Sequence, residues 1–355
     1  MSLLILGDAH DTLELMPSES VDTVITSPPY FWQRDYEVVG QIGREETIQE
    51  YLERLWAVFD VVKGKLKPEG TLFLNLGDKY VGKDRMMIPE DFAKGMKRRG
   101  WILRNEIIWH KKNPKPESTR SRFPNDWESI FFFVKSEDHY FAPQYEPYAR
   151  SSIERCKRFV ENGEAFDPQR HKHDPANVRQ AAMNITKRIA TGMAKNLCIP
   201  GQTPNGMHAA RAAGEGRDIY DSRGRRMRSV WSVAVGRYRK GHFATWPPEL
   251  ARRMILAGCP VGGTALDPFV GSGTTLIVAE ELGCAGIGID LNPEYLELAK
   301  ENILEARKWR AVAQTKRSTP RPRRTRQDNR RNRHLPAEAG QSLTPHHIPE
   351  VFEDI

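Results

Sequence analysis

Residues 264–290 read TALDPFVGSGTTLIVAEELGCAGIGID. The apolar start Thr264–Leu266 predicts a short buried strand, residues 274–282 predict a helix, and the apolar run ending at Asp290 predicts a second strand. A strand, a helix and a strand in this order form a βαβ unit, which places two parallel strands in one sheet. The stretch therefore predicts an α/β fold built on a parallel sheet.

The turn of this unit, residues 267–273, is rich in glycine. Glycine lets the backbone approach a ligand at a helix N-terminus, and an acid after the second strand, here Asp290, is placed to bind ribose hydroxyls. A dinucleotide would fit such geometry. However, Leu276 replaces the third glycine of the dinucleotide fingerprint and no Gly-Lys-Ser/Thr follows, so neither the dinucleotide nor the Walker pattern is met.

A second stretch, VDTVITSPPYF at residues 21–31, predicts a buried strand that stops at two prolines, which cannot donate ladder hydrogen bonds. Ser27–Tyr30 should then form a stiff loop at the carboxyl end of a strand, where open α/β sheets bind ligands. Such a loop suits an exocyclic amino group of a flipped nucleobase. A carbonyl of Ser27 or Pro28 would accept an amino hydrogen, the Ser27 hydroxyl would hold a neighbouring ring position, and Tyr30 would stack on the base. An ordinary Pro-Pro turn is the competing interpretation.

The Ser27-Pro28-Pro29-Tyr30 segment resembles the (Asp/Asn/Ser)-Pro-Pro-(Tyr/Phe) motif of the amino-methylating DNA methyltransferases, and residues 267–274, DPFVGSGT, resemble that family's S-adenosylmethionine loop. The order, catalytic strand first and cofactor loop last, is that of the family's β class, and the resemblance covers roughly residues 1–306. It implies a Rossmann-like, seven-stranded, circularly permuted methyltransferase fold with an inserted recognition region.

The resemblance also implies the roles of individual residues. Catalytic roles fall to Ser27, Pro28, Pro29 and Tyr30, and cofactor contacts fall to Asp267, Pro268, Phe269, Gly271, Ser272, Gly273 and Asp290. Asp267 and Phe269 would lie beside the methionine part and Asp290 beside the ribose. S-adenosylmethionine is the implied cofactor and double-stranded DNA the implied partner, and a cognate restriction endonuclease acting separately is compatible. The serine form of the motif is typical of cytosine N4 enzymes, so N4 is favoured over adenine N6.

The resemblance and the composition together divide the chain into four expected segments. Residues 1–144 are the expected catalytic half, residues 145–228 a target-recognition insert, residues 229–306 the cofactor-binding half and residues 307–355 a basic tail. Dense arginine with proline cannot pack a core, so residues 311–355 are expected to be disordered. The tail would serve as a nonspecific DNA arm or simply as a solubilising segment.

The charge distribution supports a polyanionic partner. The 355 residues, 39% hydrophobic and 28% charged, carry a net charge of +8. Residues 150–228 hold sixteen Lys and Arg against eight acids, and residues 307–333 hold twelve against one, so the remaining chain is acidic. A basic insert and tail suit DNA, because each neutralised phosphate releases counterions.

Other sequence features bear on where the protein is located and on whether it binds a metal. Residues 1–7 lack a basic start and are too short for a secretory signal, and no apolar run approaches about 20 residues, so a cytoplasmic protein without membrane spans is expected. Four cysteines without a C-x-x-C pair indicate neither a zinc site nor disulfides, and the H-x-H-D segment at 171–174 reads more readily as a loop than as metal ligands. No metal is expected.

Local patterns predict further elements. Thr47 and Glu50 form a capping box for a helix ending at Lys65, and residues 68–70 should turn the chain into strand Thr71–Leu76. Residues 31–44 are expected to form an irregular lid, and the basic loop at 110–116 is a candidate for phosphate contacts.

Two rival functions stay open. A DNA-binding module without catalysis would keep the same fold, and a related Pro-Pro-Tyr site could methylate RNA or a protein glutamine. Carbon-5 cytosine methylation is disfavoured, because that family uses a Pro-Cys nucleophile and this chain has Cys259-Pro260.

Overall fold

The computed structural model describes residues 2–149, 151, 154, 225–236 and 247–318. Most of the predicted target-recognition insert, residues 237–246 of the expected cofactor-binding half and most of the basic tail therefore lie outside the described residues. The chain divides into two units, Met1–Ala306 and Arg307–Ile355, and the architecture below is that of the first.

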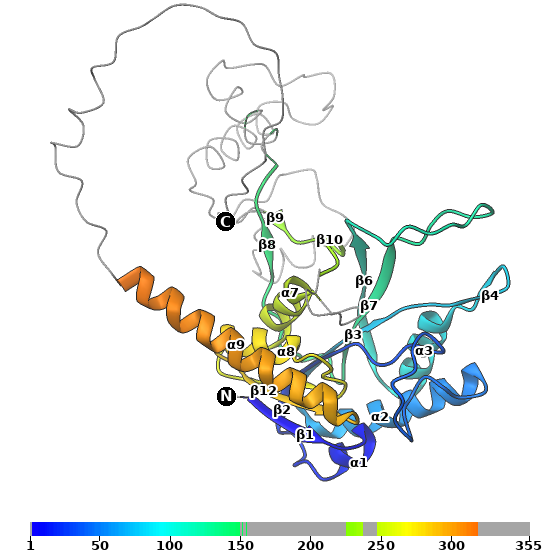
Figure 1. The fold of residues 1–355 in the computed structure, drawn as a ribbon, viewed down its shortest axis with the longest axis horizontal. Coiled ribbons are helices and arrows are strands. Elements are labelled where there is room, and N and C mark those ends of the chain that lie inside the picture. Colours follow the sequence, from blue (N-terminus) through cyan, green and yellow to red (C-terminus); the bar gives the residue numbers. More distant parts are fainter. Residues whose placement is uncertain (1, 150, 152–153, 155–224, 237–246, 319–355) are drawn as a thin grey trace, which may run out of the picture. The chain divides into compact units, whose positions relative to one another are not determined.

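One mixed sheet organises this unit (Figure 1). Its strands, in spatial order, are β1 (Ser2–Leu6), β12 (Ala285–Asp290), β11 (Thr264–Asp267), β2 (Val21–Thr26), β3 (Leu66–Leu76), β7 (Trp127–Val134), β6 (Ile102–Lys111) and β10 (Val230–Val233). Neighbours are parallel except β7, which is antiparallel to β3 and to β6. The predicted α/β class and the parallel βαβ unit are confirmed. The sheet has eight strands where seven were expected, because β10 pairs with the outer edge of β6.

Helices cover both faces of the sheet. The first apolar layer combines the strands with α1 (Ala9–Glu14), α2 (Ile48–Lys65) and α3 (Ile88–Arg98), and the second combines them with α7 (Pro248–Gly258) and α8 (Thr274–Glu281). Neighbouring strand residues alternate between the layers: Val24 packs in the first and Ile25 in the second. This two-sided burial explains the apolar run at residues 130–134 of β7, whereas β6 carries the exposed polar residues Arg104, Asn105 and Glu106. No helix among the described residues is long and apolar enough to cross a membrane.

Local predictions are largely met. The α2 capping box between Thr47 and Glu50 is present, with both hydrogen bonds formed. The predicted turn at 68–70 is wrong in part, because β3 runs from Leu66 to Leu76 and the extra residues form an irregularity in its pairing with β2. This irregularity accommodates Pro68 without breaking the strand.

The last helix, α9, corrects the predicted extent of disorder. It runs from Pro293 to Ser318, so residues 311–318 are helical. Their Ala, Gln, Lys and Arg content explains this, because all four are good helix formers and the first proline of the tail is Pro320.

Two short antiparallel ribbons branch from the sheet. The first pairs β4 (Tyr80–Val81) with β5 (Asp84–Arg85), and the second pairs β8 (Tyr145–Glu146) with β9 (Arg225–Arg226). The second ribbon joins the two ends of the predicted insert, so the chain leaves and re-enters the described structure at one place.

The sheet has a topological switch point between β11 and β2. The chain proceeds outward from β11 to β12 in one direction and from β2 to β3 in the other. Ligands of open α/β sheets bind at the carboxyl ends of strands beside such a point. Ser27 and Pro268 follow these two strands directly, so both diagnostic loops lie there.

Candidate active site

A cavity lies at this carboxyl edge and has two chambers. The first chamber is lined by residues that include Ser27, Pro28, Tyr30, Asn75, Trp109, Lys111, Glu128, Asp267, Ser272 and Thr275. The second is lined by residues that include Asp8, Pro29, Gln41, Ile42, Pro268, Asp290 and Asn292. Ser27, Tyr36, Phe269, Gly271 and Tyr295 line both, so the chambers share a wall.

The cavity thus collects ten of the eleven residues singled out from the sequence. Gly273 is the exception, since it lines neither chamber. It has a φ of 84° at the N-terminus of α8, and a Cβ there would lie 3.0 Å from the Cβ of Ala299. The structure therefore explains this glycine by its left-handed backbone and by the close approach of α9.

Asp267 ties the two diagnostic loops together. Its Oδ1 accepts hydrogen bonds from the Thr26 hydroxyl at 2.7 Å and from the Phe269 backbone N–H at 3.1 Å, and its Oδ2 accepts one from the Thr275 hydroxyl at 2.7 Å. Burial raises the pKa of Asp267 to about 6, although all three hydrogen bonds act in the opposite direction. Thr26 directly precedes Ser27, so this carboxylate fixes one loop against the other.

Asp290 holds the glycine loop from the next strand. Its Oδ2 accepts the Gly271 N–H at 2.8 Å and its Oδ1 accepts the Asn292 N–H at 2.9 Å. Burial raises the pKa of this carboxyl. A carboxylate oxygen has more than one lone pair, so Asp290 can support the loop and still accept a hydrogen bond from a ligand in the second chamber.

A directed hydrogen-bond chain leads from Ser27 into the protein. The Ser27 hydroxyl donates to the Tyr30 hydroxyl at 3.2 Å, and the Tyr30 hydroxyl donates to Glu128 Oε2 at 2.9 Å. Burial and the charge of Glu128 raise the pKa of Tyr30 well above its usual value, so this phenol keeps its proton. Because the only proton of Tyr30 is directed to Glu128, the proton of Ser27 is directed to Tyr30.

Two further side chains donate hydrogen bonds to Glu128. Lys111 donates to Glu128 Oε1 at 2.5 Å, and the side chains of this ion pair are only 21% and 13% exposed. The Asn75 amide, in a residue that is 1% exposed, donates to Glu128 Oε2 at 2.7 Å and also to the Tyr30 hydroxyl. Glu128 is thus acceptor to Tyr30, Asn75 and Lys111.

Sequence reasoning missed Glu128 as a site residue. The basic segment that contains Lys111 was expected to contact phosphates and not a carboxylate of the protein. The available signal was a glutamate at the start of the otherwise apolar strand β7, since an acid beside a buried strand needs a partner.

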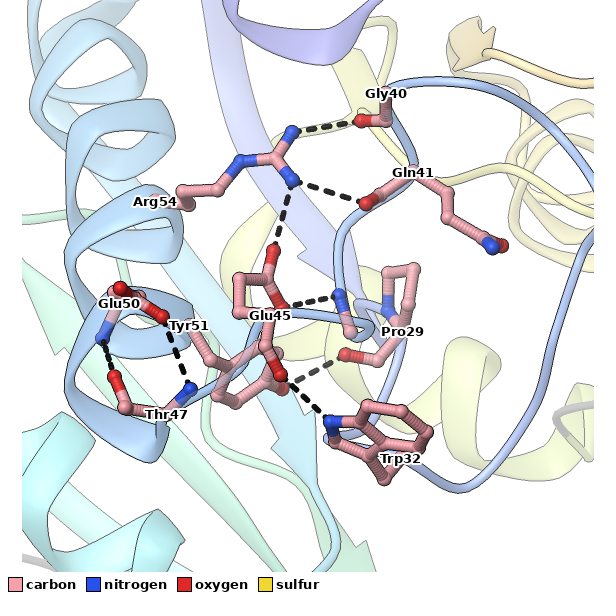
Figure 2. Close-up of polar contacts among 10 residues, drawn as sticks. Pro29, Trp32, Gly40, Gln41, Glu45, Thr47, Glu50, Tyr51 and Arg54 are labelled. Carbon is pink, nitrogen blue, oxygen red and sulfur yellow. Dashed lines mark hydrogen bonds and ion pairs between the residues drawn. The ribbon is translucent and has the colours of Figure 1, made fainter.

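The segment between Phe31 and Glu46 contributes part of the lining of the second chamber and is held by a clamp. Figure 2 shows the polar contacts of this clamp. The Arg54 guanidinium donates to Glu45 Oε1 at 2.8 Å and to the carbonyls of Gln41 and Gly40 at 2.9 and 2.7 Å. Glu45 accepts the Gly43 N–H at 2.8 Å through its carboxylate. The predicted lid is therefore an irregular loop with a defined anchor on α2.

Tyr51 extends this anchoring to the Pro-Pro loop. Its hydroxyl donates to the Pro29 carbonyl at 2.7 Å, and the Trp32 indole N–H donates to the Glu45 carbonyl at 2.6 Å (Figure 2). The Pro29 carbonyl is thereby already occupied, while Ser27 and Pro28 precede it at the cavity wall.

Replacing Arg54 by alanine is expected to loosen this clamp. The Glu45 carboxylate, only 6% exposed, would lose its cation and two carbonyls would lose their donor. We expect a loss of about 1–2 kcal/mol in the free energy of unfolding, discounted because the Arg54 side chain is 40% exposed, and a several-fold weaker affinity for the second-chamber ligand. Thermal unfolding and calorimetric titration measure these effects. Lys94→Ala on α3, which removes an exposed ion pair, is the matched control.

The sheet order and the two loops at its switch point define the Rossmann-like methyltransferase fold. Residues 21–301 match the model of the N6/N4 family described as DNA methylase, and the chain belongs to this family. It is 32% identical over 333 residues to the type II methyltransferase M.SmaI of Serratia marcescens, covering 86% of this chain and 91% of that protein. It is 31% identical to M.XycI of Xanthomonas campestris, covering 85% and 87%.

Solved structures agree on the fold. TTHA0409 of Thermus thermophilus, in complex with S-adenosyl-L-methionine, superposes with a TM-score of 0.51 at 24% identity, covering 86% of this chain and 96% of that one. The cytosine-N4-specific PvuII DNA methyltransferase superposes with a TM-score of 0.51 at 20% identity, covering 86% and 90%.

Proposed function

We propose that this chain transfers the methyl group of S-adenosylmethionine to an exocyclic amino nitrogen of a base flipped out of duplex DNA, with cytosine N4 as the target. The observation that carries the proposal is the direction of the chain Ser27 to Tyr30 to Glu128. Because the Ser27 hydroxyl directs its proton to Tyr30, it presents only lone pairs to the first chamber. We therefore assign acceptance of the amino hydrogen to this hydroxyl, in place of the carbonyl of Ser27 or Pro28 expected from the sequence. A lone pair at that wall accepts an amino N–H and repels a ring carbonyl, so the site distinguishes cytosine from uracil or thymine.

The same chain provides a route for the proton that the amino group must lose. As the nitrogen bonds to the methyl group, one of its N–H bonds breaks and the proton goes to Ser27. The Ser27 proton moves to Tyr30 and the Tyr30 proton moves to Glu128, which ends neutral. One proton is thereby carried from the substrate to a carboxylate, and Lys111 and Asn75 hold that carboxylate in place.

The second chamber fits the cofactor by its donor set. Asp290 offers carboxylate lone pairs to ribose hydroxyls, and the Gly271 backbone has space where a Cβ would stand. The buried Asp267 lines the adjoining first chamber. S-adenosylmethionine supplies a methyl group on a cationic sulfur. Phe269 lies at the shared wall, between a ligand of the second chamber and a base in the first, and Pro268 and Ser272 form the rest of this turn.

Cofactor affinity should depend on pH through Asp267. Since the pKa of this carboxyl is raised to about 6, the group is neutral below that pH and negative above it. A negative carboxylate attracts the cationic cofactor, so affinity should rise between about pH 5 and pH 7. Calorimetric titration checks this, with neutral adenosine as the comparison ligand. The rise should flatten in Asp267→Asn, and an unchanged slope in that variant would contradict the assignment.

Cytosine is favoured by the serine form of the motif and by the likeness to a cytosine-N4-specific fold neighbour. The test is to express the protein in cells, sequence the modified positions and digest the DNA to nucleosides for mass analysis. N4-methylcytosine is expected, and N6-methyladenine alone would show that the base assignment is wrong. Absence of tritium transfer to DNA would instead support a DNA-binding module without catalysis.

The relatives support a proposal for the biological setting. M.SmaI and M.XycI are type II methyltransferases, so we place this chain in the cytoplasm beside a separately acting restriction endonuclease of the same specificity. Protection of DNA from that nuclease is the corresponding assay.

A further inference from the structure

The loop at residues 112–126, between β6 and β7, carries an exposed aromatic side chain. Phe123 in this loop is 94% exposed. The loop leaves the sheet at Lys111 and returns at Trp127, next to Glu128, so it rises directly from the wall of the first chamber. A water-exposed phenylalanine on a loop whose two ends adjoin the wall of the first chamber has an apolar surface to offer to a partner bound there.

The loop is braced. At its base the Lys111 N–H donates to the Asp126 carbonyl at 2.7 Å. Inside it, Glu117 pairs with Arg122 at 2.8 Å and accepts the Asn125 N–H at 3.3 Å, and Arg122 donates to the Phe123 carbonyl at 2.9 Å. These contacts hold the backbone on both sides of Phe123.

The β4–β5 ribbon supports the loop from one side. The Arg122 guanidinium lies 3.9 Å from the centre of the Tyr80 ring, and Arg85 on the same ribbon lies 5.4 Å from the Trp127 ring. Figure 1 shows both segments extending away from the sheet in the same direction. Arg85 is also paired with Asp78 at 2.6 Å. This ion pair anchors the ribbon to the segment that follows β3.

The charge of the loop identifies the partner. Residues 112–126 hold four Lys and Arg against two acids. Cations around an apolar side chain match the duplex, whose phosphates flank stacked bases. Proteins that distort DNA insert such apolar wedges between base steps.

We propose that Phe123 enters the duplex at the target base pair and fills the space that the flipped base leaves. This inference rests on the proposed function, because a wedge is needed only if the target base leaves the stack. It adds a side chain that acts on the rest of the duplex and not on the transferred methyl group.

The test uses the full chain and a duplex carrying the site mapped by sequencing of modified DNA. Single-turnover tritium transfer is measured on the paired duplex and on a second duplex with an abasic position opposite the target base, which removes the need to break its pairing. Phe123→Ala should lose about tenfold or more on the paired duplex and should recover to within a few-fold of wild type on the second. Phe123→Leu, which keeps an apolar wedge, should retain most activity on both.

Phe141→Ala is the control, because Phe141 is also an exposed phenylalanine (48%) but packs on Phe132 away from this loop. Equal loss by Phe123→Ala on both duplexes would overturn the wedge and indicate a packing role, which thermal unfolding would register. No loss on either would overturn it as well. The mapping step tests the proposed function by itself, so the two failures are distinguishable.

Discussion

Replacing Glu128 by glutamine is expected to slow methyl transfer by about 100-fold while leaving cofactor affinity within about twofold. Glutamine has the same shape and can still accept a hydrogen bond from Tyr30, but it cannot take up a proton. Its amide N–H would also face Lys111, which is only a donor. Single-turnover transfer measures the rate and calorimetry measures cofactor binding. A variant with wild-type turnover would refute the proton route.

A double-mutant cycle with Ser27→Ala separates the route from a general loss of structure. Ser27→Ala should cost about 100-fold or more by itself, because it removes the acceptor of the amino proton. If Glu128 acts through Ser27, adding Glu128→Gln to Ser27→Ala should cost little further. Multiplicative losses would mean that the two residues act independently. Glu106→Gln is the matched control, since Glu106 on β6 accepts a hydrogen bond from Ser129 at 2.7 Å and does not line the cavity.

Replacing Asp290 by alanine is expected to weaken S-adenosylmethionine binding by about 10- to 100-fold, with a much smaller effect on transfer at saturating cofactor. The change removes the acceptor for ribose hydroxyls and leaves the N–H groups of Gly271 and Asn292 without their partner. Equilibrium titration and saturation kinetics measure the two effects separately.

Asp290→Asn separates the two roles of this carboxylate, which are to accept hydrogen bonds from the ribose and to hold the glycine loop. Asparagine retains one acceptor oxygen, so it should support part of the glycine loop and recover part of the affinity. Glu294→Ala, at an exposed position just beyond, is the control and should bind as the wild type does. Wild-type affinity in Asp290→Ala would contradict the placement of the ribose in the second chamber.

Most of the secondary structure around the cavity was predictable from local patterns. The capping box at Thr47, the apolar strands and the glycine-rich turn before α8 are each encoded within a few residues. The errors fall where the pattern is locally ambiguous. Pro68 and Gly70 are compatible with a turn and with a strand irregularity, and the basic residues after 310 are compatible with a helix and with a disordered tail.

The amino-acid sequence by itself determined the βαβ unit, the family resemblance and ten of the residues that line the cavity. The βαβ unit follows because strand ends, prolines and glycines act on their own neighbourhood in the chain, and the ten residues follow from the resemblance of two short motifs to a known family. Only the tertiary structure decided that Ser27, Asn75, Lys111 and Glu128 form one hydrogen-bonded chain. The reason is the direction of β7: it is antiparallel, so it brings its first residues, Glu128 among them, to the edge where the parallel strands end. Strand direction depends on which segments pair across the whole sheet, and no local pattern encodes it.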